Sequence, residues 1–235
     1  MTKGLVVFSG GQDSTTCLGV ALKECAKIEA VTFDYGQKHK AEIRAARLIA
    51  IEYSIPLTVI DLRPVLENMK SSALITHGDT AQKHPILKDL PASFVPVRNA
   101  LFLTAAYGLA MERSCDIIYT GVCQTDYSGY PDCRDEFIKS LNETLNLGYQ
   151  SGIEIRTPLM WLTKAETFQL ATQVGILETV IEKTVTCYNG DIDTRHEWGR
   201  GCGKCPACNL RAKGWEEFAD NYITKMHPHH IRNAH

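Results

Sequence analysis

Eight residues near the N-terminus combine glycines and hydroxyl side chains in a pattern suited to holding a phosphate group. The segment is Ser9-Gly10-Gly11-Gln12-Asp13-Ser14-Thr15-Thr16. Glycines let backbone N–H groups point into a concavity, and a following helix would add the positive end of its dipole, so the segment can bind an anion. The alternative is an ordinary turn in which Asp13 or Ser14 caps the helix.

The segment matches neither of the two commonest nucleotide-binding motifs. Gly-x-Gly-x-x-Gly is absent, and no Gly-Lys pair supplies the lysine that grips the β- and γ-phosphates in a Walker loop. Because Asp13 would repel a bare phosphate, we expect its carboxylate to hold the loop through backbone N–H groups or to bind a metal that accompanies the phosphates.

Three cysteines near the C-terminus, Cys202, Cys205 and Cys208, lie at three-residue intervals. Structural zinc prefers four ligands, and Cys187 is the natural fourth, with His196 as its competitor. An iron–sulfur cluster and unliganded thiols are the alternatives. Four thiolates leave no open coordination position, so a zinc held in this way would be structural. The surrounding basic residues would compensate its negative charge: Arg195, Arg200, Lys204, Arg211 and Lys213.

The composition excludes several classes of protein. The chain has 235 residues, 44% hydrophobic and 22% charged, which are ordinary globular values. A net charge of −2 argues against direct nucleic-acid binding as its main function. The longest apolar run, 100–111, is shorter than the roughly 18 residues that a membrane span needs, and the N-terminus does not resemble a signal peptide. We expect a cytoplasmic protein with reduced cysteines and no membrane association.

Short apolar runs alternate with longer helical patterns along most of the chain. Strands are predicted at 5–8, 30–33, 57–60, 117–120 and 153–156, and helices at 14–28, 38–53, 99–111, 135–147 and 164–174. Continuous apolar strands indicate burial on both faces, which is typical of a parallel sheet covered by helices. The predicted fold class is therefore α/β, a doubly wound parallel five-stranded sheet.

Two regions depart from this pattern. Residues 64–96 hold four prolines and few periodic apolar residues, so we interpret them as a long excursion from an α/β domain spanning 1–183. Residues 184–235 are predicted to form a small Cys-rich zinc unit and a tail. The tail contains His227, His229, His230 and His235, either as a metal-binding tract or as a mobile polar end.

Ser9-Gly10-Gly11-x-Asp13-Ser14 resembles the pyrophosphate loop of the N-type ATP pyrophosphatases, which cleave ATP between the α- and β-phosphates. Further stretches, in order from Leu5 to about Phe218, are similar to one family of this superfamily that acts in queuosine biosynthesis. They are Asp34-Tyr35-Gly36-Gln37, Val95-Pro96-Val97-Arg98-Asn99, Gly129-Tyr130-Pro131-Asp132-Cys133-Arg134, Thr157-Pro158-Leu159, Thr163-Lys164-Ala165-Glu166, Thr186-Cys187-Tyr188 and the cysteine cluster.

This resemblance implies an ATP-dependent ligase with an adenine nucleotide alpha-hydrolase-like fold. Such an enzyme converts 7-carboxy-7-deazaguanine and ammonia to the corresponding nitrile through an adenylylated acid and an adenylylated amide, and it releases AMP and pyrophosphate. The resemblance further implies ATP with Mg²⁺, a homodimer, and a structural Zn²⁺ on Cys187, Cys202, Cys205 and Cys208.

The resemblance also implies which residues bind ATP. They are Phe8, Ser9, Gly10, Gly11, Gln12, Asp13, Ser14, Thr15, Thr16, Cys17 and Leu18, with Asp34 and Tyr35 on the adenine side. Asp13 and Ser14 would be catalytic. Arg98 and Lys164 are the candidate cations for the charge that develops on the α-phosphate. The alternative for both is a surface or capping role, which Lys164 suits poorly because the start of a helix favours anions.

The deazaguanine would be bound by residues around the fourth predicted strand and the helix before it. One carboxylate, Asp132 or Glu136, would accept the donor edge of the base. Arg134 would bind the substrate carboxylate, Tyr130 would stack on the base, and Asn99 completes the set. Asp132 could instead cap the helix that starts near residue 135.

Two other functions have to be considered. A tRNA thiolase or tRNA-lysidine synthetase of the same superfamily would bind a polyanion, which a net charge of −2 disfavours. A thiolase would also need a sulfur-carrying cysteine, for which Cys123 or Cys133 is available, although packing explains a lone cysteine more often. A non-catalytic binding domain stabilised by zinc would leave the Ser-Gly-Gly-x-Asp-Ser loop unexplained.

Overall fold

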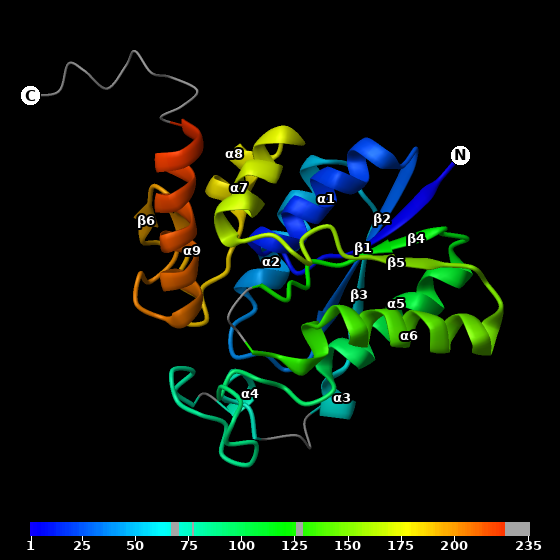
Figure 1. The fold of residues 1–235 in the computed structure, drawn as a ribbon, viewed down its shortest axis with the longest axis horizontal. Helices are drawn as coiled ribbons and strands as arrows, with labels where there is room; N and C mark the ends of the chain where they lie inside the picture. The colour runs from blue at the N-terminus through cyan, green and yellow to red at the C-terminus, as the bar shows by residue number, and fades with distance from the viewer. Residues whose placement is uncertain (67–70, 77, 126–128, 224–235) are drawn as a thin grey trace, which may run out of the picture.

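The computed structural model describes residues 1–66, 71–76, 78–125 and 129–223 (Figure 1). Its main sheet has five strands, β1 (Lys3–Val7), β2 (Lys27–Asp34), β3 (Leu57–Asp61), β4 (Ile117–Tyr119) and β5 (Glu154–Arg156). All pairings are parallel and the order is β3-β2-β1-β4-β5. Strands β2 and β3 are added on one side of β1, whereas β4 and β5 are added on the other side. The point between β1 and β4 is therefore the topological switch point, which is where ligands bind in such folds. The predicted fold class is confirmed.

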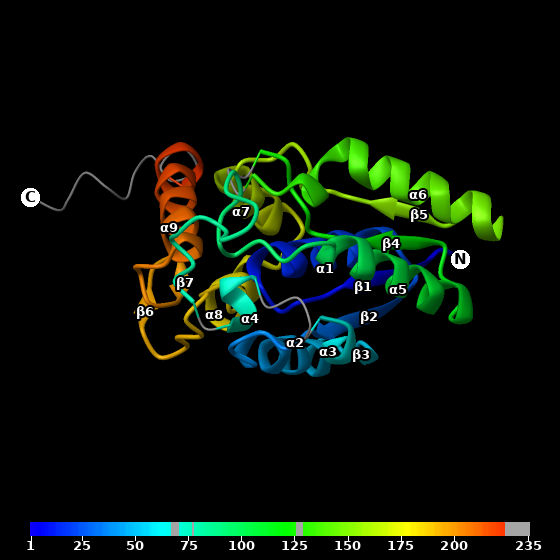
Figure 2. The same ribbon diagram turned by 90° about the horizontal axis from the view of Figure 1, so that it is seen from below.

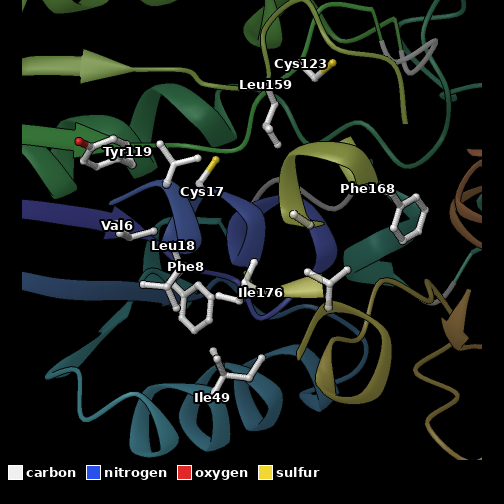
Figure 3. Packing of buried hydrophobic residues seen from close by; sticks show 14 of the residues in the cluster. Val6, Phe8, Cys17, Leu18, Ile49, Tyr119, Cys123, Leu159, Phe168 and Ile176 are labelled. Atoms are coloured by element: carbon white, nitrogen blue, oxygen red, sulfur yellow. The ribbon is translucent and has the colours of Figure 1, made fainter. Parts of the chain in front are cut away.

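Helices cover both faces of the sheet, as Figure 1 shows. One face carries α1 (Gln12–Glu24), α2 (Ala41–Glu52), α7 (Lys164–Gln173) and α8 (Leu177–Lys183). The other carries α5 (Arg98–Glu112) and α6 (Asp135–Tyr149). Side chains alternate along β1 and the residue that follows it, so Val6 and Phe8 pack on the first layer and Leu5 on the second. Figure 3 shows Val6 and Phe8 close to Leu18 and Ile49 in the first layer.

Two secondary-structure predictions were wrong in detail. We predicted a helix over 14–28, but α1 ends at Glu24 and β2 begins at Lys27. Ile28 is apolar at helical spacing, yet it pairs with Gly4 in the sheet, so strand pairing overrides the helical pattern there. Helix α8 was not predicted, because its seven residues are too few to show a clear period.

The predicted excursion contains two short helices, α3 (Arg63–Leu66) and α4 (Ala73–Thr76), and an isolated bridge between Lys83 and Pro91. It is attached to the carboxyl edge of the sheet. The N–H of Lys38 donates to the carbonyl of Leu74 at 2.9 Å, and Leu66, Leu74 and Val95 form a small buried cluster with Tyr35. The excursion therefore lies beside the end of β2.

The C-terminal unit comprises β6 (Arg195–His196), β7 (Gly199–Arg200), α9 (Pro206–Phe218) and a π-helical turn, η2 (Ala219–Ile223). Figure 2 shows α9 at the end of the molecule opposite the N-terminus. The ring of Phe168 on α7 lies 5.2 Å from that of Trp215 and 5.8 Å from that of Phe218. These rings join the unit to the core of the sheet domain.

The predicted domain boundary near residue 184 stays a prediction. The histidines expected to form a metal tract or a mobile tail lie outside the described residues. Among the helices that the structure describes, none has the length and apolar character needed to cross a membrane.

Candidate functional site

The predicted phosphate loop connects β1 to α1 at the carboxyl edge of the sheet. Gly11 is the N-cap of α1, so the alternative in which Asp13 or Ser14 caps the helix is wrong. The Ser14 hydroxyl lies within the loop, where it accepts the Ser9 backbone N–H at 3.2 Å and approaches the Ser9 hydroxyl at 3.0 Å. Contacts between Ser9 and Ser14 therefore hold the two ends of the loop together. The positive end of the α1 dipole faces the space beyond β1.

Two glycines allow neighbouring elements to approach this loop. Gly10 has a φ of +82°, and a Cβ there would lie 2.5 Å from the Ala46 nitrogen and the Glu42 carbonyl oxygen of α2. Gly121, two residues after the end of β4, would place a Cβ 3.0 Å from the Ser14 nitrogen. The loop is therefore held between α2 and the end of β4, at the position where the sheet topology reverses.

Lys164 and Asp13 form an ion pair at the loop. The Lys164 ammonium donates to both carboxylate oxygens of Asp13, each at 2.9 Å. Lys164 is the first residue of α7, which is capped by reciprocal hydrogen bonds between Thr163 and Glu166. We expected Asp13 to bind loop N–H groups or a metal; its carboxylate instead contacts the lysine that we had assigned to the phosphates.

A second wall of the site is aromatic and cationic. The guanidinium carbon of Arg98, at the start of α5, lies 6.0 Å from the ring centre of Tyr35 and 5.9 Å from that of Tyr130. Burial opposes the charge of Arg98, but the neighbouring phenols and the Asp132 carboxylate outweigh it and raise the arginine pKa. Burial likewise raises the pKa of Tyr35 to about 12. Tyr35 is therefore neutral and Arg98 charged at physiological pH.

The loop, the ion pair and the aromatic wall enclose one cavity of about 320 Å³. Eleven of the twenty residues predicted to act in catalysis or to bind ATP or the substrate line it: Phe8, Ser9, Gly11, Gln12, Asp13, Ser14, Tyr35, Arg98, Asn99, Tyr130 and Lys164. Other predicted ATP contacts do not line it: Gly10, Thr15, Thr16, Cys17, Leu18 and Asp34. Cys17 and Leu18 are fully buried in the core, and the Asp34 carboxylate accepts from Lys40 at 3.0 Å.

Three residues predicted to bind the substrate lie outside the cavity lining: Asp132 and Glu136, the candidates for the base, and Arg134, the candidate for the substrate carboxylate. Asp132 is buried, and its Oδ2 accepts the Asn99 backbone N–H at 3.2 Å. It therefore caps α5 and not α6, which corrects the alternative that we had considered. Arg134 and Glu136 are exposed around the start of α6.

Glu42 was missed by the sequence analysis. It lies in the first turn of α2, half-buried, and lines the cavity. Burial raises the pKa of its carboxyl group to about 7, although the positive charge of Arg98 acts in the opposite direction. An acid in the first turn of a helix is common, so the sequence carried no signal that this one faces a cavity.

The four cysteines form a cluster that fits a metal ion. The sulfur atoms of Cys187, Cys202, Cys205 and Cys208 all lie within 4.8 Å of one another. Two of the sulfur–sulfur distances, Cys202 to Cys208 and Cys187 to Cys205, are 4.0 Å. A tetrahedral site with zinc–sulfur bonds of about 2.3 Å has edges of about 3.8 Å. His196, the competing ligand, is stacked on Trp198 and bonds the Gly201 carbonyl at 2.9 Å.

Arg211 is the basic residue that links this cluster to the rest of the site. Its guanidinium is fully buried and donates to the carbonyls of Trp198 at 2.9 Å and Val180 at 2.7 Å. It also donates to the hydroxyls of Thr184 at 2.9 Å and Thr186 at 3.0 Å. Burial lowers its pKa to about 10, while the charges of Asp13 and Cys208 act in the opposite direction. We had interpreted Arg211 as charge compensation alone.

The segment before Cys187 also contacts the phosphate loop. The N–H of Gln12 donates to the Thr186 hydroxyl oxygen at 3.4 Å, and the N–H of Val185 donates to the Gly10 carbonyl at 3.0 Å. Thr186 lines the cavity. The cysteine cluster is therefore connected to the anion site through one short stretch of chain, which the spacing of the cysteines did not reveal.

Comparison with known proteins gives a consistent picture. The family model described as "Queuosine biosynthesis protein QueC" matches residues 3–219. A 7-cyano-7-deazaguanine synthase of Wolinella succinogenes is 52% identical over 215 residues, 91% of this chain and 92% of the relative. The same-named protein of Clostridium botulinum is 48% identical over 221 residues, 94% of this chain and 98% of the relative.

A solved structure shares the fold. A 4-thiouridine synthetase in complex with RNA and ATP superimposes with a TM-score of 0.52 at 19% identity, covering 93% of this chain and 51% of that one. This likeness is evidence for the architecture of the sheet and its helices.

Proposed function

The chain belongs to the QueC family of queuosine biosynthesis proteins, and on that premise we propose that it converts 7-carboxy-7-deazaguanine and ammonia to 7-cyano-7-deazaguanine, using ATP. The relatives described above are named 7-cyano-7-deazaguanine synthase, which supports 7-cyano-7-deazaguanine as the product. The single observation that carries the mechanism is the cavity in which the Ser9–Ser14 loop faces Lys164 and Arg98.

The loop suits the pyrophosphate part of ATP. It offers a helix N-terminus and hydroxyl groups but no Walker lysine, so it is built to hold a diphosphate and release it. The substrate carboxylate attacks the α-phosphorus, the bond to the β-phosphate breaks, and pyrophosphate leaves. Arg98 and Lys164 supply fixed positive charge for this step. Mg²⁺ would accompany ATP, and Asp13 is the carboxylate within the loop that could contact it.

Two rounds of adenylylation are needed to reach the nitrile. Ammonia attacks the acyl adenylate and displaces AMP, because AMP is a much better leaving group than hydroxide, and the product is the amide. The amide oxygen then attacks a second ATP, with loss of another pyrophosphate. Loss of AMP and of both N–H protons from the adenylylated amide leaves the C≡N bond.

We assign Zn²⁺ to the four-cysteine cluster as a structural ion. Four thiolates fill a tetrahedral site, so no position is open for substrate or water. The ion would hold the 187–208 segment together and thereby position Thr186 beside the loop. We also propose that the enzyme is a cytoplasmic homodimer, as the family resemblance implies; light scattering of the purified protein tests the oligomeric state.

A thiolase function is disfavoured by the chemistry of Cys133. Burial, together with the Asp132 carboxylate, raises the pKa of Cys133 to about 12. A sulfur-transfer cysteine works as a thiolate, and its pKa is ordinarily lowered. Cys123 also lines the cavity, but its sulfur lies 3.2 Å from the Leu162 carbonyl and 3.0 Å from the Thr125 hydroxyl.

Nucleotide product analysis tests the proposal. The enzyme is incubated with 7-carboxy-7-deazaguanine, ammonium and ATP, and AMP and ADP are resolved over time. We expect two AMP and two pyrophosphate for each nitrile, with the amide as a transient. ADP as the sole nucleotide product would overturn the mechanism, and no turnover with this acid would overturn the substrate.

A further inference from the structure

The cavity contains one carboxylate that the mechanism does not use. Among the described residues that line it, Asp13 and Glu42 are the acidic ones. Asp13 is held by Lys164 through both carboxylate oxygens. The Glu42 carboxylate makes no hydrogen bond or ion pair with any described residue, although it is half-buried and faces the cavity. A half-buried acceptor without a protein partner is costly unless a ligand supplies donors.

The surroundings of Glu42 fit a flat, neutral ring better than a phosphate. Tyr35, Tyr130 and Tyr188 line the cavity near the Arg98 guanidinium. Aromatic rings of this kind stack on a planar heterocycle, and the carboxylate of Glu42 would repel a phosphate placed against it. We therefore expect the phosphates of ATP to face the hydroxyl groups of the loop and not the Glu42 carboxylate.

We propose that Glu42 is the specificity-determining residue that accepts the N1–H and 2-amino donor edge of the deazaguanine ring. This inference rests on the proposed function. Two adjacent donors match the two oxygens of one carboxylate, whereas adenine offers a single amino group beside an acceptor nitrogen. The residues that we first considered for this role, Asp132 and Glu136, do not line the cavity. Arg98 remains available to the carboxylate of the substrate.

The test compares two substrates in two variants. The substrates are 7-carboxy-7-deazaguanine and the analogue without the 2-amino group, 7-carboxy-7-deazahypoxanthine. The variants are Glu42→Gln and the matched control Glu52→Gln. The control makes the same change at the last residue of α2, where the carboxylate is exposed and pairs with Lys183 at 2.5 Å.

We expect Glu42→Gln to lower kcat/KM for the deazaguanine acid about 10²-fold or more, because a site built to bind donors loses its acceptor. The preference over the deazahypoxanthine analogue should collapse in this variant, and KM for ATP should stay within about threefold of the unaltered enzyme. Glu52→Gln should keep both the rate and the preference. Thermal unfolding of each variant establishes that the protein is folded.

Three results would overturn the inference. One is an unchanged substrate preference in folded Glu42→Gln. The second is a selective loss of the preference for ATP over 2′-deoxy-ATP, which would show that the carboxylate accepts from the ribose. The third is a loss of kcat with unchanged KM and unchanged preference, which would assign Glu42 to proton transfer. In all three cases the unaltered enzyme still makes nitrile, whereas failure of the proposed function would appear as no turnover by that enzyme.

Titration calorimetry with the product 7-cyano-7-deazaguanine gives a readout that does not need turnover. The unaltered protein should bind it at least about 10²-fold more tightly than Glu42→Gln does. Equal affinities would contradict the assignment of Glu42 to the base.

Discussion

The Lys164 ammonium lies 2.9 Å from both carboxylate oxygens of Asp13, so the first residue of α7 is bound to the first turn of α1. Only 9% of the Lys164 side chain and 29% of the Asp13 side chain are exposed, so the pair is largely shielded from solvent. A lysine at the start of a helix is unfavourable with respect to the helix dipole, and the carboxylate offsets this. The two residues act as one unit at the edge of the phosphate loop.

Lys164→Ala and Asp13→Ala should each lower kcat about 10²-fold or more, because both belong to the charged lining of the site. The double variant should have a kcat only slightly lower than that of either single variant, since each change destroys the same ion pair. Lys164→Ala should also lower the unfolding free energy by about 2 kcal/mol, because Asp13 loses its partner. Single-turnover AMP formation and denaturant unfolding measure these effects.

Lys183→Ala is a matched control, because it breaks a solvent-exposed lysine–glutamate pair, with Glu52. Exposed pairs contribute less than about 1 kcal/mol, so both rate and stability should stay near their original values. A near-normal rate for Lys164→Ala would remove this lysine from the chemistry.

The cysteine cluster should contain about one zinc ion per purified chain. Cys205→Ser and Cys208→Ser should lose the metal and lower the thermal midpoint, because four ligands are needed for the closed site. His196→Ala should retain the metal, since His196 is engaged with the Gly201 carbonyl. Elemental analysis of each protein, with thermal unfolding before and after chelation, checks this.

Cys25→Ser provides the control for the cluster variants. Cys25 is partly exposed, and its sulfur lies 3.5 Å from the Tyr119 hydroxyl, remote from the cluster. Its replacement should leave the zinc content unchanged. Iron and sulfide in place of zinc would contradict our assignment of the metal.

Cys133 should react slowly with iodoacetamide at pH 7. With a pKa of about 12, it forms roughly 10³-fold less thiolate than a thiol of ordinary pKa. The rate of modification should rise tenfold per pH unit throughout the measurable range, because the pKa lies above it. Mass spectrometry of modified peptides gives the rate for each cysteine. Fast labelling of Cys133 near neutral pH would restore the thiolase alternative.

Local motifs of this protein could be predicted from the sequence, and contacts between distant segments could not. The loop after β1 and the four-cysteine set depend on residue types at short intervals, so spacing predicted them. Asp13 and Lys164 are 151 residues apart, and no periodicity predicts that their side chains meet. The burial of Arg211 was missed for a similar reason, because a charged residue on a helix is ordinarily solvated. Tertiary packing decided these partners.

Arg211 donates to the hydroxyl groups of both Thr184 and Thr186. Replacing each threonine in turn distinguishes an effect on stability from an effect on ATP binding. Thr186 also accepts the N–H of Gln12 and lines the cavity, whereas Thr184 bonds the Val180 carbonyl at 2.5 Å and is fully buried. Thr184→Val and Thr186→Val should each destabilise the protein by about 1–2 kcal/mol, because the buried guanidinium loses one acceptor.

Only Thr186→Val should impair catalysis, raising KM for ATP about tenfold while the zinc content stays unchanged. The Thr186 hydroxyl accepts from both Gln12 and Arg211, so its own proton is available to a phosphate oxygen bound at the loop. Initial rates over a range of ATP concentrations, together with metal analysis, distinguish the two variants. If Thr184→Val raised KM for ATP as much as Thr186→Val does, the effect would come from Arg211 and the stability of the C-terminal unit, and Thr186 would have no direct part in binding ATP.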